Sequence, residues 1–131
     1  MNPYPILRAA LICAALASPA FAQDVSGGGG LAPEPKTGQE VYTVICQACH
    51  MADGKGGVGA GQLPALANNP KLAAPGYPIA MVLNGRGAMP WFKDSLTPAQ
   101  IAGVVSYIRT HFGNNFTQPV TEADVKALTG E

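Results

Sequence analysis

The sequence has few charged side chains, and those it has are balanced in sign. Lys and Arg together number eight, Asp and Glu number eight, and charged residues make up 12% of the 131 residues. No basic cluster is present that could contact a nucleic-acid backbone, and a net charge near zero gives little long-range steering of a partner. The composition therefore excludes a nucleic-acid-binding function, and we expect partner contacts to depend on shape and apolar surface.

A long apolar run is also missing. The stretch Ala9–Ala17 falls well short of the roughly 20 residues that a membrane-spanning helix needs, and Ser18-Pro19 breaks the helix directly after it. A basic residue, Arg8, precedes the stretch, and Ala20-Phe21-Ala22 has the small-x-small pattern of a cleavage site. We therefore predict a signal peptide over residues 1–22, cleavage after Ala22, export to the periplasm and no transmembrane anchor in the mature form.

Glycine and proline, in contrast, are plentiful, at 16 and 12 residues. The Gly27–Gly30 run and two prolines give residues 23–36 the composition of a flexible linker. Residues 37–113 contain most of the apolar periodicity and are predicted to form one compact domain. Residues 114–131 are predicted to be a C-terminal tail with a short helix.

The predicted secondary structure is helical. Thr37 with Glu40, and Thr97 with Gln100, have the spacing of capping boxes at helix starts. Apolar residues at helical intervals follow each box. The expected helices cover residues 38–50, 78–83, 98–112 and 122–128. No strand pattern is visible, and residues 52–75 are expected to form a long loop with little regular structure. The fold class is thus all-α.

One motif carries chemistry. Two cysteines and a histidine occur as Cys46-Gln47-Ala48-Cys49-His50, the attachment signature for c-type haem. Positions i, i+3 and i+4 of a helix share one face, so both thiols and the imidazole can meet one flat ligand. The thiols add to the two haem vinyl groups, and His50 reaches the iron. The motif predicts one covalent haem c with three to four short helices wrapped around it.

The alternative for this motif is a disulfide or a thiol-exchange site of the thioredoxin kind. Redox thiols gain from a helix N-terminus, which stabilises thiolate. Here the pair lies at the C-terminal end of the predicted helix, where the helix dipole disfavours thiolate, and no βαβ pattern surrounds it. The haem interpretation is therefore favoured.

Iron held by His50 needs a second protein ligand or keeps an open position. Three methionines and one histidine are candidates: Met51, Met81, Met89 and His111. Met51 adjoins His50 and cannot reach the opposite haem face, Met81 has the pattern of a core residue, and His111 is expected at the surface. Met89 lies in a glycine-rich loop before Pro90, which fixes the backbone, so Met89 is the predicted ligand. Thioether ligation raises the reduction potential relative to bis-histidine haem.

Beyond this motif, residues 36–113 resemble the class I cytochrome c family. Gly38, Tyr42 and Tyr107 are similar to the small and aromatic positions at which that family's first and last helices cross. Pro64 resembles the loop proline whose carbonyl accepts the proton of the iron-binding histidine, and Met89-Pro90 resembles the axial methionine loop. The resemblance implies a cytochrome c fold over residues 37–113, with Cys46, Cys49, His50, Pro64 and Met89 at the cofactor.

The expected function is electron transfer by a periplasmic single-haem carrier and not an enzyme activity. Its expected partners are redox proteins, namely a dehydrogenase donor and an oxidase or cytochrome acceptor. The expected docking face is the apolar rim near Met51, Val58, Ala88 and Trp91. Two alternatives remain open: a permanently bound subunit of a periplasmic dehydrogenase or oxidase complex, and a high-spin haem enzyme or gas binder if Met89 does not ligate iron.

Overall fold

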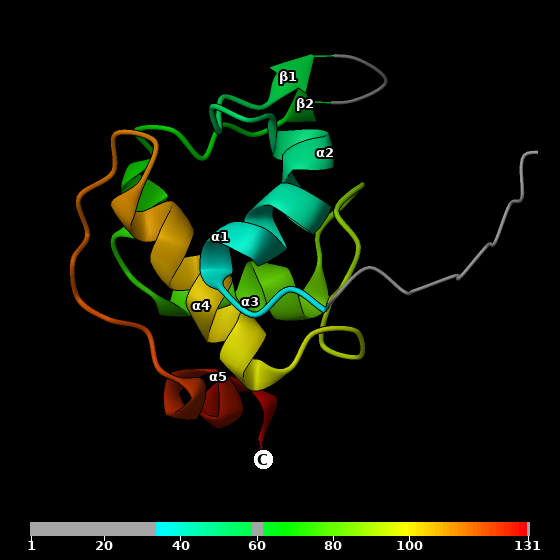
Figure 1. Cartoon of the computed structure of the whole chain (residues 1–131), viewed down its shortest axis with the longest axis vertical. Helices are drawn as coiled ribbons and strands as arrows, with labels where there is room; N and C mark the ends of the chain where they lie inside the picture. The colour runs from blue at the N-terminus through cyan, green and yellow to red at the C-terminus, as the bar shows by residue number, and fades with distance from the viewer. Residues whose placement is uncertain (1–33, 59–61, 131) are drawn as a thin grey trace, which may run out of the picture. The chain divides into compact units, whose positions relative to one another are not determined.

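Helices joined by long loops form the structure, a computed structural model that describes residues 34–58 and 62–130 (Figure 1). The elements are α1 (Gly38–Val41), η1 (Tyr42–Cys46), α2 (Gln47–His50), β1 (Gly57–Val58), β2 (Gln62–Leu63), η2 (Pro70–Leu72), α3 (Gly76–Asn84), α4 (Pro98–Thr110) and α5 (Glu122–Thr129). The predicted signal peptide, and the predicted linker as far as residue 33, lie outside the described residues. In the described part no helix is long and apolar enough to cross a membrane.

The first helix is continuous from Gly38 to His50, as predicted, but it is not α-helical throughout. Thr37 and Glu40 form the expected capping box. The middle segment η1 is π-helical, with the Gln47 amide donating to the Tyr42 carbonyl five residues earlier. Capping and apolar spacing predict that a helix forms, but they do not distinguish an α-turn from a wider π-turn.

This first helix crosses α4 at two glycines (Figure 1). A Cβ atom placed on Gly38 would lie 2.0 Å from the Gly103 carbonyl oxygen, so the two backbones are in direct contact. Beside this contact the Tyr42 ring lies 5.5 Å from Tyr107 and 4.8 Å from Phe112, measured between centroids. The crossed helix pair that the resemblance implied is present.

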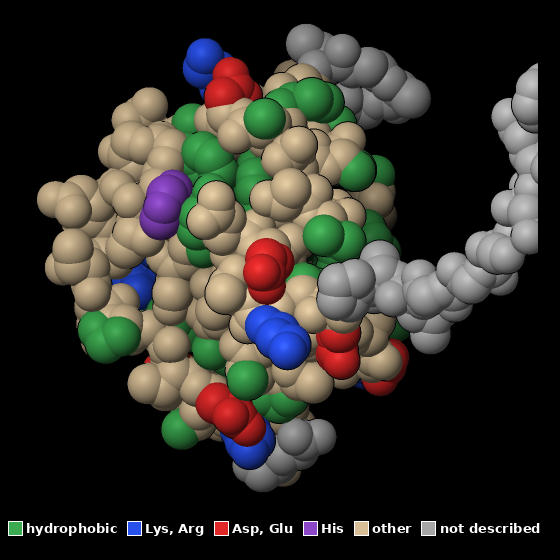
Figure 2. All heavy atoms as spheres, viewed as in Figure 1, with side chains coloured by type: hydrophobic (Ala, Val, Ile, Leu, Met, Phe, Trp, Pro, Cys, Tyr) green, Lys and Arg blue, Asp and Glu red, His purple; other side chains and the backbone are tan. Residues whose placement is uncertain are grey.

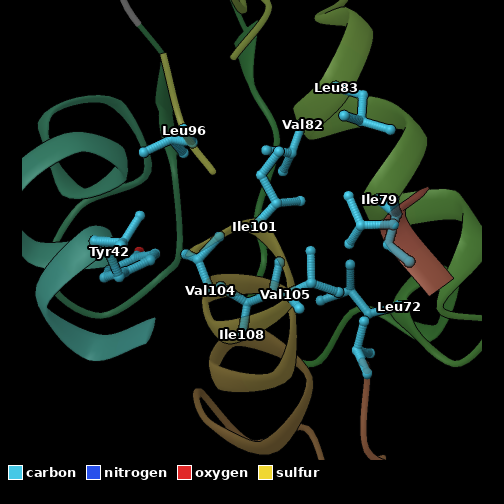
Figure 3. Close-up of a cluster of buried hydrophobic side chains, with 14 residues drawn as sticks. Tyr42, Leu72, Ile79, Val82, Leu83, Leu96, Ile101, Val104, Val105 and Ile108 are labelled. Carbon is cyan, nitrogen blue, oxygen red and sulfur yellow. The ribbon is translucent and has the colours of Figure 1, made fainter. Parts of the chain in front are cut away.

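The core lies between α4, the first helix and α3 (Figure 3). The predicted apolar stripe of α4 is buried in full, and it comprises Ile101, Val104, Val105 and Ile108. Helix α3 contributes Ile79, Val82 and Leu83. Helix α4 ends at Thr110, two residues earlier than predicted, because His111 adopts an extended conformation and Phe112 has a φ of 58°.

Residues 114–130 pack onto this core. Helix α5 begins at a capping box of Thr121 and Asp124, and it packs on α3 and α4 with Val125 fully buried. Arg109 of α4 is 1% exposed, and its guanidinium donates to the carbonyls of Leu72, Ala73 and Gln118. These bonds join η2, α4 and the segment before α5, so the C-terminal segment is integrated in the packing.

The structure differs from the sequence prediction in two further places. Helix α3 covers Gly76–Asn84 and is longer than the predicted 78–83, because Pro78 occupies the first turn instead of the helix start. Strands β1 and β2 form a short antiparallel pair, with Gly57 opposite Leu63 and Val58 opposite Gln62, whereas no strand was expected. Strands of two residues are too short to show the alternation on which a strand prediction depends. Among the other described residues of 52–75, the turn of η2 is the one regular element, so little regular structure is present there, as expected.

Candidate functional site

The cysteine-histidine motif spans the end of η1 and the whole of α2. Cys46 is half-buried, Cys49 is exposed, and both are free thiols. His50 ends the helix and is only 8% exposed. Across the described residues no three His, Cys, Asp or Glu side chains converge as a metal-chelating cluster. Two free thiols and one imidazole thus lie within five residues at the end of the first helix.

The His50 ring has a defined hydrogen-bond partner. Its Nδ1 atom lies 3.1 Å from the Pro64 carbonyl oxygen. A carbonyl can only accept, so Nδ1 carries the proton and the other nitrogen, Nε2, presents its lone pair. This is the tautomer that an iron-binding histidine needs, and the contact is the one that the sequence resemblance implied.

A tight glycine turn brings Pro64 next to His50. The Gly56 amide donates to the His50 carbonyl at 3.1 Å. Gly56 has a φ of +65°, and a Cβ on it would lie 2.1 Å from the Leu63 carbonyl oxygen. Only glycine fits this position without strain, because it must combine a positive φ with direct backbone contact.

The backbone of Met51, the residue that follows the motif, is held by a hydrogen bond from the helix crossing. The Tyr42 hydroxyl donates to the Met51 carbonyl at 2.7 Å. Met51 itself has a φ of 65°, and its side chain is exposed. Burial raises the pKa of Tyr42 to about 12, so the hydroxyl stays protonated as a donor at neutral pH. Tyr42 thus links the buried crossing to the backbone that leaves His50.

The Met89 backbone is held in a tight turn. Arg86 and Met89 exchange two backbone hydrogen bonds of 3.0 Å, and Gly87 between them has a φ of +60°. A Cβ on Gly85 would lie 2.4 Å from the Met89 carbonyl oxygen. The Met89 side chain is half-buried and packs on the same core as Cys46.

The other candidate ligands are placed differently. Met81 is half-buried within α3. His111 is exposed and stacks on Tyr107 with ring centroids 4.0 Å apart. Of the docking residues expected from the sequence, Trp91 is 62% exposed and Met51 is 41% exposed.

The Cys46 thiol is poorly suited to start disulfide exchange. Burial, and then the neighbouring Cys49, raise the pKa of Cys46 to about 11. At neutral pH this thiol is therefore protonated, whereas exchange needs a thiolate. The observation agrees with the position of the motif at a helix C-terminus.

The comparisons with known proteins decide the family. The family of cbb3-type cytochrome c oxidase subunit III matches residues 33–108, more than half of the chain. The chain belongs to the cytochrome c family. Cytochrome c6 of Nostoc sp. is 34% identical over 105 residues, which cover 79% of this cytochrome and 85% of that protein.

Two further matches differ in how much of the other protein they cover. The cytochrome c subunit of alcohol dehydrogenase (quinone) of Gluconacetobacter polyoxogenes is 38% identical over 104 residues, or 70% of this chain and 22% of that subunit. The present cytochrome thus spans about a fifth of that relative. Cytochrome c6 of the diatom Phaeodactylum tricornutum is a solved structure that is 27% identical with a TM-score of 0.47, over 56% of this chain and 87% of that one.

The family confirms the small class I c-type cytochrome and the all-α cytochrome c fold. The protein carries covalently bound haem c, and the one Cys-x-x-Cys-His motif in the sequence provides for one haem. Membership of the cytochrome c family supports a role in electron transfer. The donor set described above fits this cofactor, since two free thiols precede a histidine whose tautomer leaves Nε2 for iron.

Proposed function

We propose that this cytochrome is a periplasmic carrier that moves one electron at a time between a dehydrogenase-type donor and an oxidase or cytochrome acceptor. Cys46 and Cys49 hold the haem through thioether bonds, and His50 and Met89 are the iron ligands. The hydrogen bond from His50 Nδ1 to the Pro64 carbonyl supports this ligand set most directly, because it orients the imidazole and selects its tautomer.

The haem supplies a reversible one-electron change between ferric and ferrous iron. The chain determines the iron ligands and, through them, the reduction potential. The Pro64 carbonyl accepts the hydrogen bond from His50 Nδ1–H, and this fixes the tautomer whose Nε2 lone pair would bind iron. The Met89 thioether favours the ferrous state and raises the potential. If both His50 and Met89 bound the iron, no position would be left for a substrate, which suits a carrier. The rigid turn at Arg86 and Met89 limits rearrangement between oxidation states.

Export and partner contact complete the proposal. Residues 1–22 are a signal peptide cleaved after Ala22, residues 23–36 a linker, residues 37–113 the cytochrome c domain and residues 114–131 a tail. The exposed apolar side chains Trp91 and Met51 are part of the docking face. On the face seen in Figure 2, acidic and basic side chains are intermixed, which suits brief contacts of low electrostatic selectivity.

A second candidate function is a permanently bound cytochrome subunit or domain of a dehydrogenase. The match to the alcohol dehydrogenase subunit favours it, although this chain spans only about a fifth of that relative. The cytochrome c6 match favours the free carrier, because it covers 85% of that protein. Size-exclusion chromatography of native periplasm separates the two, since a free carrier elutes at its own mass and a subunit elutes in a larger haem-staining complex.

The ligand set is tested by a matched pair of methionine variants made in a host with working haem-attachment machinery. Intact mass should show loss of residues 1–22 and gain of one haem. The wild type and the control Met81→Ala should show a low-spin spectrum with the weak far-red sulfur-to-iron band. Met89→Ala should lose that band and bind carbon monoxide. Persistence of the band in Met89→Ala would refute Met89 as the ligand, and rapid carbon monoxide binding by the wild type would favour the gas-binding alternative.

A further inference from the structure

We propose that Asn114 is a positioning residue for His50. Its buried amide holds the loop that presents the Pro64 carbonyl to the imidazole, and in this way it lowers the reduction potential of the haem. The inference rests on the proposed role of His50 as an iron ligand. Asn114 lies beyond α4, 64 residues from His50 in the sequence.

The amide of Asn114 is saturated with backbone hydrogen bonds. Its Nδ2 atom donates to the carbonyls of Leu66 and Ile108, each at 2.8 Å. Its Oδ1 atom accepts from the Asn69 amide at 2.9 Å. The residue is 6% exposed, so these bonds replace water at a buried site. One side chain thus joins the end of α4 to both ends of the segment 66–69.

The same segment is held from its other side by Gly54. The amides of Leu66 and Ala67 donate to the Gly54 carbonyl at 2.7 and 2.9 Å, and the Asn68 amide donates to the Phe112 carbonyl at 3.0 Å. Leu66 is therefore fixed through both its N–H and its carbonyl. It follows Pro64 by two residues, and strand β2 ends at the residue before Pro64. The Pro64 carbonyl is fixed from both directions along the chain.

Asparagine is suited to this position because it offers two donors and an acceptor without a charge. An aspartate could not donate to the two carbonyls, and an aliphatic side chain would leave all three backbone groups without a partner in a buried site. Asn114 is also remote in sequence from the haem motif, so its effect on His50 must pass through the loop backbone.

The expected electronic effect follows from the His50 hydrogen bond. A bond from Nδ1 to a carbonyl makes the imidazole a stronger electron donor to the metal. Stronger donation favours ferric iron and lowers the potential. When the Asn114 amide is removed, segment 66–69 loses its bonds to this side chain and keeps those to the Gly54 and Phe112 carbonyls. The contact between Pro64 and His50 then weakens, and the equilibrium moves toward the ferrous state.

The test compares the holoprotein of Asn114→Ala with that of Val125→Ala. Val125 is fully buried in α5 and has no bond to the loop, so its variant controls for lost stability. We expect Asn114→Ala to move the redox equilibrium toward ferrous haem by about 3- to 10-fold, where tenfold corresponds to 59 mV for one electron. The hyperfine-shifted Nδ1 proton of His50 should move, and the Leu66 and Ala67 amides should exchange faster. Val125→Ala should lose thermal stability with its potential and its Nδ1 signal unchanged.

Three other outcomes are informative. If the potential and the Nδ1 signal of Asn114→Ala are unchanged, Asn114 contributes to stability alone, and the inference is overturned. A wild type without hyperfine-shifted His50 protons would refute the ligand set, and the inference with it. Should Asn114→Ala not fold, Asn114→Ser keeps one donor and one acceptor, and its potential should shift in the same direction by less; no shift would contradict the inference.

Discussion

The helix crossing and the loop beside His50 are both assembled around glycine, but for different purposes. At the crossing, Gly38 and Gly103 allow two helix backbones to touch, and the surrounding contacts are apolar rings and aliphatic side chains. Beside His50, Gly56 allows a turn in which backbone amides and carbonyls make the contacts. The crossing is therefore expected to determine mainly stability, and the loop mainly the properties of His50, the proposed iron ligand.

The largest effect on stability is expected from Gly38→Ala. The added methyl group would meet the Gly103 carbonyl at 2.0 Å, and neither backbone can move without opening the core. We expect a loss of about 3 kcal/mol in the free energy of unfolding, measured by guanidinium denaturation of the holoprotein. The visible spectrum of the folded fraction should stay that of the wild type. Gly76→Ala is the matched control, since a Cβ there meets nothing within 4 Å; equal losses in both variants would contradict the packing argument.

Gly56→Ala is expected to cause the second-largest loss of stability. It is also expected to change the surroundings of His50 more than the other substitutions in this comparison. A side chain at φ +65° is strained, and its Cβ would lie 2.1 Å from the Leu63 carbonyl, so we expect a loss of about 2 kcal/mol. Because Gly56 also bonds the His50 carbonyl, the hyperfine-shifted His50 resonances and the potential should change. The comparison between the two regions fails if Gly38→Ala alters these resonances and Gly56→Ala does not.

Tyr42→Phe tests the residue that connects the regions. Loss of the hydroxyl leaves the Met51 carbonyl without this donor, and we expect a cost of about 1 kcal/mol. The raised pKa of Tyr42 also predicts a pH effect: its stabilising contribution is complete below pH 10 and is lost as pH rises to about 12, because the unfolded chain ionises first.

Denaturation curves at pH 8 and pH 11 measure this effect. The stability difference between wild type and Tyr42→Phe should shrink at the higher pH. Val104→Ala, which removes a buried apolar group that does not ionise, is the control and should show no such narrowing. A difference that is constant between the two pH values would show that the Tyr42 hydroxyl is not buried as described.

The smallest effect on stability is expected from Lys55→Ala, in the loop beside His50. Lys55 pairs with Asp53 at 3.1 Å, but both side chains are exposed, and the Lys55 amide still donates to the carboxylate in the variant. Solvent screens such a pair, so the midpoint of thermal unfolding should match that of the wild type within error. A clear loss would show that side-chain charges as well as backbone bonds support the loop beside His50.

Much of the helical structure was predictable from short stretches of sequence. The capping boxes at Thr37 and Thr97 place both helix starts at the observed residues. The end of α4 was predicted two residues too late, because the positive φ of Phe112 depends on its packing and not on its residue type. The short strand pair was missed for a similar reason, since it forms where the chain folds back on itself.

The candidate site was only partly predictable. The motif Cys46 to His50 is visible in the sequence, and the contact of Pro64 with His50 followed from a family resemblance. Asn114 is the first residue of the predicted C-terminal tail, for which the sequence predicts no particular role. Nothing local distinguishes it from its exposed neighbour Asn115, because burial of its amide depends on segments 45 and 48 residues earlier in the chain.

The sequence by itself determined where α1, α4 and α5 begin and the family to which this cytochrome belongs, and it predicted which residues attach the haem. These features depend on contacts over three or four residues, or on a motif of fixed spacing. Only the tertiary structure decided which glycines touch, how Arg109 joins the C-terminal segment to the core, and how Asn114 supports the loop next to His50. Those contacts join residues far apart in the chain, so their energies exist only once the helices have packed.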